Sequence, residues 1–318
     1  FKTKCGSFPD LPILTQKTYS SPIETDTNTR IIVIGAGISG IAAAHKLHKY
    51  GFKHITILEA RNRIGGRIHT IENKTHPEVA IDLGASWIHG DSNENPLKKL
   101  AKKYNIKAKA FDLNNSYTVY DNNGNRIDDN TLTSYQNKYS DFLEYLDKLA
   151  NDNRTNHMSV GKALHRYITE NNISKKDQAA LLFFSNLFIE FQYANDINHL
   201  SLYFDNSESY PGVDKYVVSG YKKLIDHLAK PIRRDIRLNQ AVTSIDYTTP
   251  NNIIVTTSKG ETFNANYVIC TVPIGVLKSK SITFIPALPQ DKQLALKHMD
   301  MNIMDKVILT FPTVFWDN

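Results

Sequence analysis

The chain has 318 residues, of which 41% are apolar and 22% charged, so it is long enough and apolar enough to form two folded domains. Its 38 basic and 32 acidic side chains leave a formal charge of +6, and the basic residues are dispersed, which does not indicate nucleic-acid binding. No run approaches about 18 consecutive apolar residues, so we predict no membrane span. Only two cysteines, Cys5 and Cys270, are present, which excludes a disulfide framework and a four-cysteine metal site. We predict no metal site.

Residues 1–29 are rich in Pro, Ser and Thr and show no sustained hydrophobic period, which predicts a flexible N-terminal segment. They contain no apolar stretch of the kind that a signal peptide needs. Because the sequence also lacks an initiator Met, a cytoplasmic and a secreted location both stay open, and the oligomeric state is not indicated.

Regular structure is first predicted at residues 31–34, a β-branched run typical of a central parallel strand buried on both faces. Residues 41–50 have helical periodicity, and Gly51 follows where a helix commonly ends in the left-handed conformation. Residues 54–59 read as a second strand. Together they predict one βαβ unit at the start of the ordered chain.

The glycines between these two strands match a dinucleotide-binding fingerprint in its correct context, after a strand and at the start of a helix. Gly35 permits the tight turn, Gly37 lets a pyrophosphate approach the backbone, and Gly40 lets the helix pack closely on the strand. Glu59 follows at the carboxyl end of the second strand, where a carboxylate accepts hydrogen bonds from ribose hydroxyls. The alternative is a structural turn with a surface Glu. This unit alone leaves NAD and FAD both open.

The middle of the chain is predicted to be mostly helical. Asn95 and Pro96 are a good cap and first residue for a helix, and a hairpin is expected over residues 117–124. Residues 131–194 then keep apolar side chains at helical spacing, and Ser159 and Ser174 are expected helix caps.

The hydrophobic period changes to two after Ile236, which predicts strands. Residues 241–247, 253–257 and 261–264 read as an antiparallel meander, and residues 267–272 as another strand buried on both faces. Cys270, in that last strand, is expected to serve packing rather than redox chemistry. Strand and helix signals of the nucleotide-binding type therefore occur at the beginning and again after about residue 215, on either side of the helical block.

Several further motifs, taken together, resemble the flavin-containing amine oxidases, and look most like the polyamine (spermine/spermidine) oxidase branch. These motifs are Gly65-Gly66-Arg67, the stretch from Ile81 to Gly90 (I-D-L-G-A-S-W-I-H-G), Glu94 to Leu97, Thr271 to Leu277 (T-V-P-I-G-V-L) and Met304 to Pro312. The resemblance implies FAD as the cofactor. The family pattern continues past Asn318, so we expect its last flavin-binding segment and the aromatic walls of the amine site to lie outside this sequence.

The fingerprint and the resemblance together predict the cofactor-binding residues. For Gly84, Ala85 and Trp87 the expectation rests on the resemblance alone, and Trp87 is equally compatible with core packing. Val242 is expected to contact adenine through its backbone. The full predicted set is Gly35, Gly37, Ile38, Ser39, Gly40, Glu59, Ala60, Arg61, Gly65, Gly66, Arg67, Gly84, Ala85, Ser86, Trp87 and Val242.

Three residues are predicted to act in catalysis. Lys306 is placed in a strand with apolar neighbours, which either buries it or lets it reach solvent at an edge; the matching lysine in related oxidases holds a water against flavin N5. Glu190 lies in an apolar helical segment, where it either faces a substrate tunnel or is satisfied by a neighbouring Arg or by Asn186. His89 occupies a position that the resemblance associates with substrate contact, the alternative being a structural histidine.

The expected fold is α/β: a Rossmann-like FAD-binding domain over residues 30–108 and 215–298, with an inserted, mostly helical α+β substrate domain over 109–214 and 299–318. The resemblance implies oxidation of polyamines by hydride transfer to flavin N5, giving an aldehyde, a shorter amine and hydrogen peroxide. The expected partners are a small-molecule amine and dioxygen, without nucleic acid. The alternatives are a monoamine or L-amino-acid oxidase of the same family, or a non-catalytic remnant of the fold. A chromatin demethylase is disfavoured because no long helical insertion is seen.

Overall fold

The computed structural model describes residues 27–73, 79–110, 117–152, 158–202 and 210–315. These residues form two compact units. One unit comprises the described parts of Gln16–Phe111 and Tyr210–Met301, and the other those of Asp112–Ser209 and Asn302–Asn318. Most of the predicted flexible segment 1–29 lies outside the described residues. The roles predicted for the two parts, cofactor binding and substrate binding, stay predictions.

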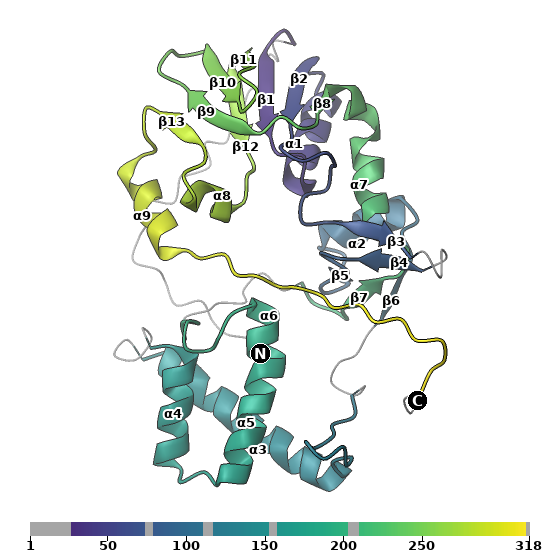
Figure 1. Ribbon diagram of the computed structural model, residues 1–318, viewed down its shortest axis with the longest axis vertical. Helices are drawn as coiled ribbons and strands as arrows, with labels where there is room; N and C mark the ends of the chain where they lie inside the picture. The colour runs from purple at the N-terminus through teal and green to yellow at the C-terminus, as the bar shows by residue number, and fades with distance from the viewer. Residues whose placement is uncertain (1–26, 74–78, 111–116, 153–157, 203–209, 316–318) are drawn as a thin grey trace. The chain divides into compact units, whose positions relative to one another are not determined.

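The first unit is built on a parallel sheet with the strand order β12-β1-β2-β8 (Figure 1). Strand β1 (Arg30–Ile34) pairs with β2 (His54–Leu58) on one side and with β12 (Tyr267–Cys270) on the other, and β8 (Ile236–Arg237) pairs with β2. Helix α1 (Ile38–Lys49) connects β1 to β2, which confirms the predicted βαβ unit. The helix begins three residues before the predicted start, because Gly37 is its N-cap and Gly40 is tolerated within its first turn.

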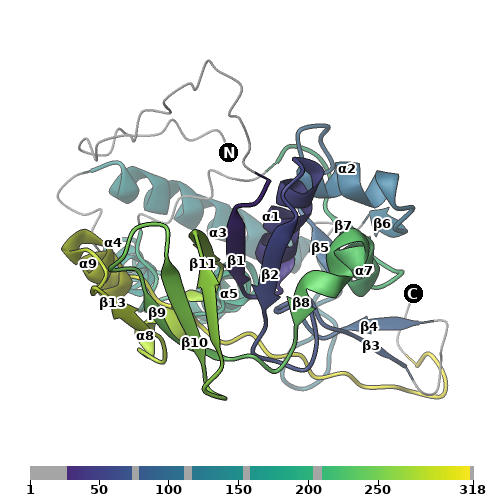
Figure 2. The same ribbon diagram turned by 90° about the horizontal axis from the view of Figure 1, so that it is seen from above.

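Alternate residues of β1 face two different layers. Val33 packs in a core with α1 and with α7 (Lys222–Ala229), whereas Ile32 and Ile34 pack in a second core with residues of the meander, among them Val255. Figure 2 shows α1 and α7 on one side of β1 and β2, and β9 and β10 on the other. A strand covered on both faces needs apolar side chains at every position, which explains the continuous apolar run in the sequence.

The layer opposite the helices is a second sheet with the order β11-β10-β9-β13. The predicted meander is confirmed, with β9 antiparallel to β10 and β10 antiparallel to β11, while β13 lies parallel to β9. Gly260 has a φ of +78° in the turn between β10 and β11, a conformation that glycine adopts without strain. The bounds are Val242–Asp246 for β9, Ile253–Thr257 for β10, Thr262–Ala265 for β11 and Thr283–Ile285 for β13.

Smaller elements complete this unit. Helix α2 (Pro96–Lys103) is capped by the Asn95 side chain, which accepts a hydrogen bond from the Leu97 N–H, as predicted. Strand β7 lies between β5 and β6 and is antiparallel to both. The remaining elements are β3 (Thr70–Glu72), β4 (Ala80–Asp82), β5 (Trp87–Ile88), β6 (Ala108–Ala110), β7 (Lys215–Val217), η3 (Lys230–Asp235), α8 (Ile274–Lys278) and α9 (Gln290–His298).

Among its described residues, the second unit is mostly helical between residues 129 and 193, as predicted. Ser159 and Ser174 cap their helices by accepting hydrogen bonds from the Lys162 and Asp177 backbone N–H groups. The core of this unit is aromatic and aliphatic, and the fully buried Phe142 and Phe184 lie within it. Its elements are α3 (Asp129–Ala150), α4 (Val160–Glu170), α5 (Lys175–Ser185), the π-helical segment η2 (Asn186–Glu190) and α6 (Phe191–Tyr193).

The predicted hairpin over 117–124 is present in short form: Tyr120 and Arg126 form an antiparallel bridge, and the Ile127 N–H donates to the Val119 carbonyl at 2.8 Å. Two other sequence-based expectations are wrong. Strand β12 is not buried on both faces: it is the outermost strand of the sheet among the described residues, so Tyr267 and Cys270 are exposed. Cys270 is therefore not a buried packing residue.

The strand expected around Lys306 is also absent. Residues 301–311 have neither helix nor strand, and their side chains are exposed. An alternating apolar pattern becomes a strand only when a neighbouring strand accepts its backbone hydrogen bonds, and no described strand pairs with this segment.

Candidate functional site

The glycine turn after β1 has the backbone geometry that a dinucleotide requires. Gly35 has a φ of +103°, and its N–H donates to the Leu58 carbonyl at 2.8 Å. A Cβ at Gly40 would lie 1.9 Å from the Gly35 carbonyl oxygen, so only glycine allows the first turn of α1 to approach β1 this closely. These contacts account for both glycines without invoking a ligand.

Gly37 differs from its neighbours because the space beside it is open. It is the N-cap of α1, no side chain caps that end, and a Cβ built on it would have no heavy atom within 4 Å. Ile38 and Ser39 follow as the first helical residues. An uncapped helix N-terminus with free space beside it is suited to an anionic group such as a diphosphate, because its N–H groups and the helix dipole favour negative charge.

Three segments that are separate in the sequence contact one another in turn: the Gly65–Gly66 turn contacts Gly37, and Gly84 contacts the end of that same turn. Gly65 forms a bridge with Gly37 and its N–H donates to the Ala36 carbonyl at 2.8 Å, while a Cβ on Gly66 would lie 3.2 Å from the Gly37 Cα. The next contact is with Gly84, whose Cβ would lie 1.8 Å from the carbonyl oxygen of Arg67. The Ala85 N–H donates to that same oxygen at 3.2 Å. The three predicted glycine segments are therefore linked by direct backbone contacts, and we call them together the glycine surface.

Glu59 is buried at the end of β2, with only 7% of its surface exposed. Its Oε2 accepts a hydrogen bond from the Ala36 N–H at 2.7 Å, and its Oε1 accepts one from the Arg61 N–H at 2.9 Å. These contacts hold the carboxylate against the glycine turn, and each oxygen keeps a lone pair with which it can accept a ribose hydroxyl. Ala60 and Arg61 are exposed beside it.

Val242 begins β9, and its buried side chain packs in the core with Ile34 and Leu58. The preceding segment approaches the site, since the Gln240 N–H donates to the Glu59 carbonyl at 2.8 Å. A contact of Val242 with a ligand would therefore have to use its backbone, as the sequence predicts.

Cationic side chains surround the Gly65–Arg67 turn. Burial lowers the pKa of His69 below its usual value, and the positive charges of Arg63 and Arg61 lower it further. Burial and the neighbouring Arg61 also lower the pKa of Arg63, an effect that Glu59 partly opposes. This positive potential next to the open helix N-terminus favours an anionic ligand. Arg67 is exposed on the same turn.

The segment from Ser86 to His89 runs along β5. Ser86 is buried, and its carbonyl accepts a hydrogen bond from the Val217 N–H. The Trp87 ring packs edge-on against Tyr216, with 5.5 Å between the ring centroids, and the Trp87 carbonyl accepts from the Tyr221 hydroxyl. His89 follows β5, and its Nδ1 lies 2.9 Å from an oxygen of Asp214.

Glu190 lies in the π-helical segment of the other unit. Its Oε2 accepts a hydrogen bond from the Asn186 amide at 2.7 Å, and its Oε1 accepts one from the Ile197 N–H at 2.9 Å. The contact expected from the structural alternative, a hydrogen bond from Asn186 to the Glu190 carboxylate, is therefore present. π-helical turns are frequent at functional sites, so the predicted tunnel role stays a prediction. Lys306 also belongs to this unit, so the three predicted catalytic residues are divided between the units, with His89 in the first.

Sequence reasoning missed two residues. One contacts the glycine turn after β1, and the other contacts His89. Thr271, after β12, donates from its hydroxyl to the Ile34 carbonyl at 2.8 Å and lies against Gly35 and Gly40. It was within a recognised motif, but its proximity to the turn depends on β12 pairing with β1. Asp214 carried no signal of its own, because its contact with His89 depends on strands more than a hundred residues apart.

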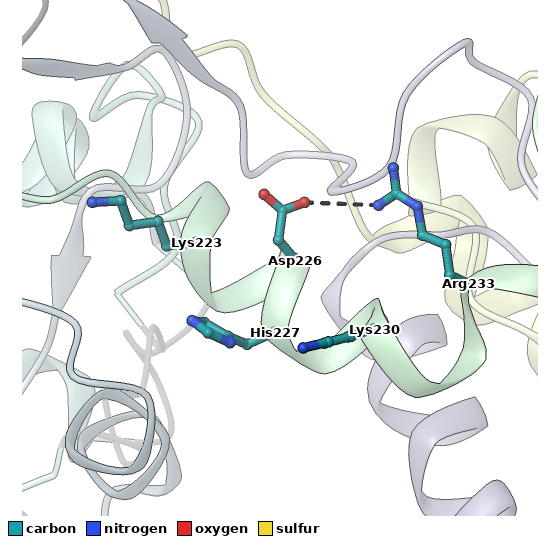
Figure 3. Close-up of a pocket in the computed structure, with 5 residues that line it drawn as sticks. All are labelled: Lys223, Asp226, His227, Lys230 and Arg233. Carbon is teal, nitrogen blue, oxygen red and sulfur yellow. Dashed lines mark ion pairs between the residues drawn. The ribbon is translucent and has the colours of Figure 1, made fainter.

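Two hollows in the first unit are lined by residues outside the predicted site. One, of about 430 Å³, is lined by Lys223, Asp226, His227, Lys230 and Arg233 on α7 and η3; Figure 3 shows Asp226 turned toward Arg233, with 3.9 Å between their charged atoms. The other, of about 300 Å³, has Arg63, Ile68 and His69 among its lining residues and therefore borders the Gly65–Arg67 turn.

No helix among the described residues has the length and apolar character needed to cross a membrane.

Comparisons with known proteins agree with this geometry. The family described as flavin containing amine oxidoreductase matches residues 38–318. A probable polyamine oxidase 4 of Arabidopsis thaliana is 37% identical over 99% of this chain, and polyamine oxidase 3 of Oryza sativa subsp. japonica is 34% identical over 95% of it. A lysine-specific histone demethylase 1 homolog 2 of Arabidopsis thaliana is 31% identical over 92% of the chain and 39% of its own length.

The chain spans 64% and 63% of the lengths of the two polyamine oxidases that it matches. Its family match includes α1, the Gly65–Arg67 turn and the Gly84–His89 segment, which carry the backbone surface described above. The open helix N-terminus, the glycine contacts and the buried carboxylate of Glu59 all fit a dinucleotide. The chain therefore belongs to the flavin-containing amine oxidoreductases, with a Rossmann-like fold and FAD as its cofactor.

Proposed function

We propose that the whole protein oxidises polyamines, with dioxygen as the final electron acceptor. When bound, FAD supplies an acceptor for a hydride equivalent from the carbon next to the amine nitrogen and passes both electrons to dioxygen, giving hydrogen peroxide. The amine becomes an iminium ion, which adds water and separates into an aldehyde and a shorter amine. The protein's own contribution is to hold the cofactor and to orient the amine.

The cofactor-holding residues are proposed from the backbone surface of the first unit. The N-terminus of α1 at Gly37 would hold the diphosphate, and the carboxylate of Glu59 would accept hydrogen bonds from the ribose. The Gly65–Arg67 turn and Gly84 would complete the contact with backbone atoms, and the positive charge of Arg67 would favour the anionic cofactor.

The amine-contacting residues are proposed from both units. His89 would contact the substrate, Glu190 would attract its positive charge along the tunnel, and Lys306 would act near the flavin ring. A carboxylate favours a cationic amine over a neutral one by direct charge attraction, which suits a substrate with several ammonium groups.

The observation that supports this proposal most is the contact of the Gly65–Gly66 turn with Gly37 at an open helix N-terminus, in a chain whose relatives include polyamine oxidases. A structural turn alone would need glycine at Gly35, Gly40 and Gly84, where a Cβ would clash, but would not need it at Gly37, where the space is empty.

The test is to express the protein from its complete gene, purify it with FAD and measure hydrogen peroxide release. We expect release with spermine or spermidine and little release with tyramine or free amino acids. Release with tyramine or an amino acid alone would replace polyamines by monoamines or amino acids as the substrate class. Release only with a methylated histone peptide would favour the activity named for the demethylase relatives.

A preparation that retains FAD but releases no peroxide with any amine would contradict the oxidase proposal and favour a non-catalytic remnant of the fold. Loss of FAD during purification would be resolved by titrating the cofactor back and repeating the assay.

A further inference from the structure

We propose that Asp214 is a positioning residue that holds the His89 imidazole with its Nδ1 protonated and its Nε2 directed outward as a hydrogen-bond acceptor for a substrate amine. This inference rests on the proposed function for its substrate, but the orientation of the ring rests on the contacts of the first unit alone.

The pairing of β5 with β7 brings the two residues together. Ile88 pairs with Lys215 in antiparallel register, so His89, which follows Ile88, and Asp214, which precedes Lys215, come next to each other at the end of the pair. Figure 1 shows β5 beside β7. The His89 Nδ1 lies 2.9 Å from Asp214 Oδ2. A carboxylate can only accept, so Nδ1 carries the hydrogen of this bond, and in the neutral ring the lone pair is then on Nε2.

Asp214 is held in place by a second hydrogen bond. Its Oδ1 accepts from the Gly90 N–H at 2.8 Å, so the carboxylate bridges the side chain and the backbone of adjacent residues. Gly90 itself has a φ of +68°, and a Cβ on it would lie 1.9 Å from the Tyr210 carbonyl oxygen. The two segments are therefore packed backbone to backbone at this point, which limits the freedom of the carboxylate.

The backbone of His89 and Gly90 is also held by a buried side chain. The Asn95 amide, which is 1% exposed, donates to the carbonyls of both His89 and Gly90 at 2.8 Å. An ordinary surface ion pair holds two mobile side chains and contributes little to stability. Here the histidine backbone and its carboxylate partner are each held by further hydrogen bonds, so the ring is oriented before any ligand arrives.

The ring is nevertheless accessible. The His89 side chain is 71% exposed, and among the described residues Nε2 has no hydrogen-bond partner. An outward-facing lone pair on an oriented ring is a suitable acceptor for the N–H of an amine, and an acceptor favours an amine nitrogen over a carboxylate or a phosphate oxygen. The neighbouring acid Asp91 is paired with Lys215 instead, at 2.7 Å, and so offers a matched control.

The first measurement is the tautomer of His89 by two-dimensional ¹⁵N–¹H NMR of the full-length protein, with the signal assigned by His89→Gln. We expect the Nδ1–H form in the wild type and in Asp91→Asn. We expect a mixture, or the Nε2–H form, in Asp214→Ala. Spermine should shift the Nε2 signal of the wild type. A wild-type ring in the Nε2–H form, or an Asp214→Ala tautomer equal to that of the wild type, would overturn the inference regardless of activity.

The second measurement is a double-mutant cycle on kcat/KM for spermine. Asp214→Ala should lower kcat/KM about tenfold when His89 is present and less than about twofold in a His89→Ala background, because the carboxylate acts through the ring. An equal loss in both backgrounds would show a purely structural role and would overturn the inference while the proposed function stands. If the expected tautomers are observed but the protein oxidises no amine, the proposed function is overturned, and the substrate contact of His89 with it.

Discussion

Individual glycines in this chain are required for different reasons, and the contacts of each glycine distinguish these reasons. At Gly40 and Gly84 a methyl group would overlap a backbone oxygen, at 1.9 Å and 1.8 Å, so the fold itself needs glycine there. At Gly37 the space beside the Cα is open. A residue that the fold does not need but the fingerprint contains is best explained by the approach of a ligand.

The paired substitutions Gly37→Ala and Gly40→Ala test this distinction. Gly37→Ala should lower the stability of the flavin-free protein by less than about 1 kcal/mol, because only the N-cap preference changes. The added methyl group would nevertheless occupy the space proposed for the diphosphate, so the Kd for FAD should rise about tenfold or more. Gly40→Ala should cost about 3 kcal/mol in the flavin-free protein, because the methyl group overlaps a backbone oxygen.

The measurements are urea unfolding of the flavin-free variants and titration with FAD. Unchanged FAD affinity in Gly37→Ala would contradict the placement of the diphosphate beside this residue, whatever the stability of Gly40→Ala.

Some helices of this protein are capped by side chains at their N-terminal ends. Helix α2 is the clearest case, because its N-cap Asn95 also donates to the two carbonyls of the His89–Gly90 segment. One buried amide thus connects the start of a helix to the end of β5. The side chains of Ser159 and Ser174 cap α4 and α5 by accepting from backbone N–H groups of those same helices.

Substitution of Asn95 should therefore cost more than the loss of an ordinary cap. Asn95→Ala removes the acceptor for the Leu97 N–H and leaves two carbonyls without their donor, which should lower the free energy of unfolding by about 2 kcal/mol or more. Asn95→Asp keeps the cap but places a carboxylate against the same two carbonyls, and should also be destabilising.

The control is Asn93→Ala, at an exposed residue whose side chain accepts from Lys98 and which should change stability by less than about 0.5 kcal/mol. Urea unfolding provides the comparison. An Asn95→Ala variant as stable as Asn93→Ala would contradict the bridging role.

On the scale of the whole molecule, the proposed chemistry needs groups from both compact units. The glycine surface and His89 belong to one, and Glu190 and Lys306 to the other. A role for Lys306 near the flavin ring is therefore a statement about the assembled protein and has to be tested on it.

We propose that the Lys306 ammonium assists proton movement during reoxidation, so Lys306→Met in the full-length protein should slow peroxide release by about tenfold or more. The ratio of FAD to protein should stay unchanged, since the proposed cofactor contacts lie in the other unit. The control Lys297→Met changes an exposed lysine on α9 and should keep the wild-type rate. Reoxidation of reduced flavin by dioxygen, followed in a stopped-flow instrument, gives the rate directly. A wild-type rate in Lys306→Met would remove this residue from the mechanism.

The sequence by itself determined the features that depend on local chemistry and on periodicity. The βαβ unit, the glycine turn, the meander and the caps at Asn95, Ser159 and Ser174 were all predictable, because each follows from residues within a few positions of one another. The family motifs were also readable in the sequence, since they are short and occur in a fixed order.

The tertiary structure alone decided which distant segments meet. Thr271 reaches the glycine turn because β12 pairs with β1, and Asp214 reaches His89 because β5 pairs with β7. The same principle explains the errors: β12 is exposed at an edge, and the segment around Lys306 forms no strand, because burial and strand formation depend on a neighbouring strand that local sequence does not specify. Pairing between strands far apart in the chain is a property of the whole fold, and residue patterns within one segment carry no record of its partner.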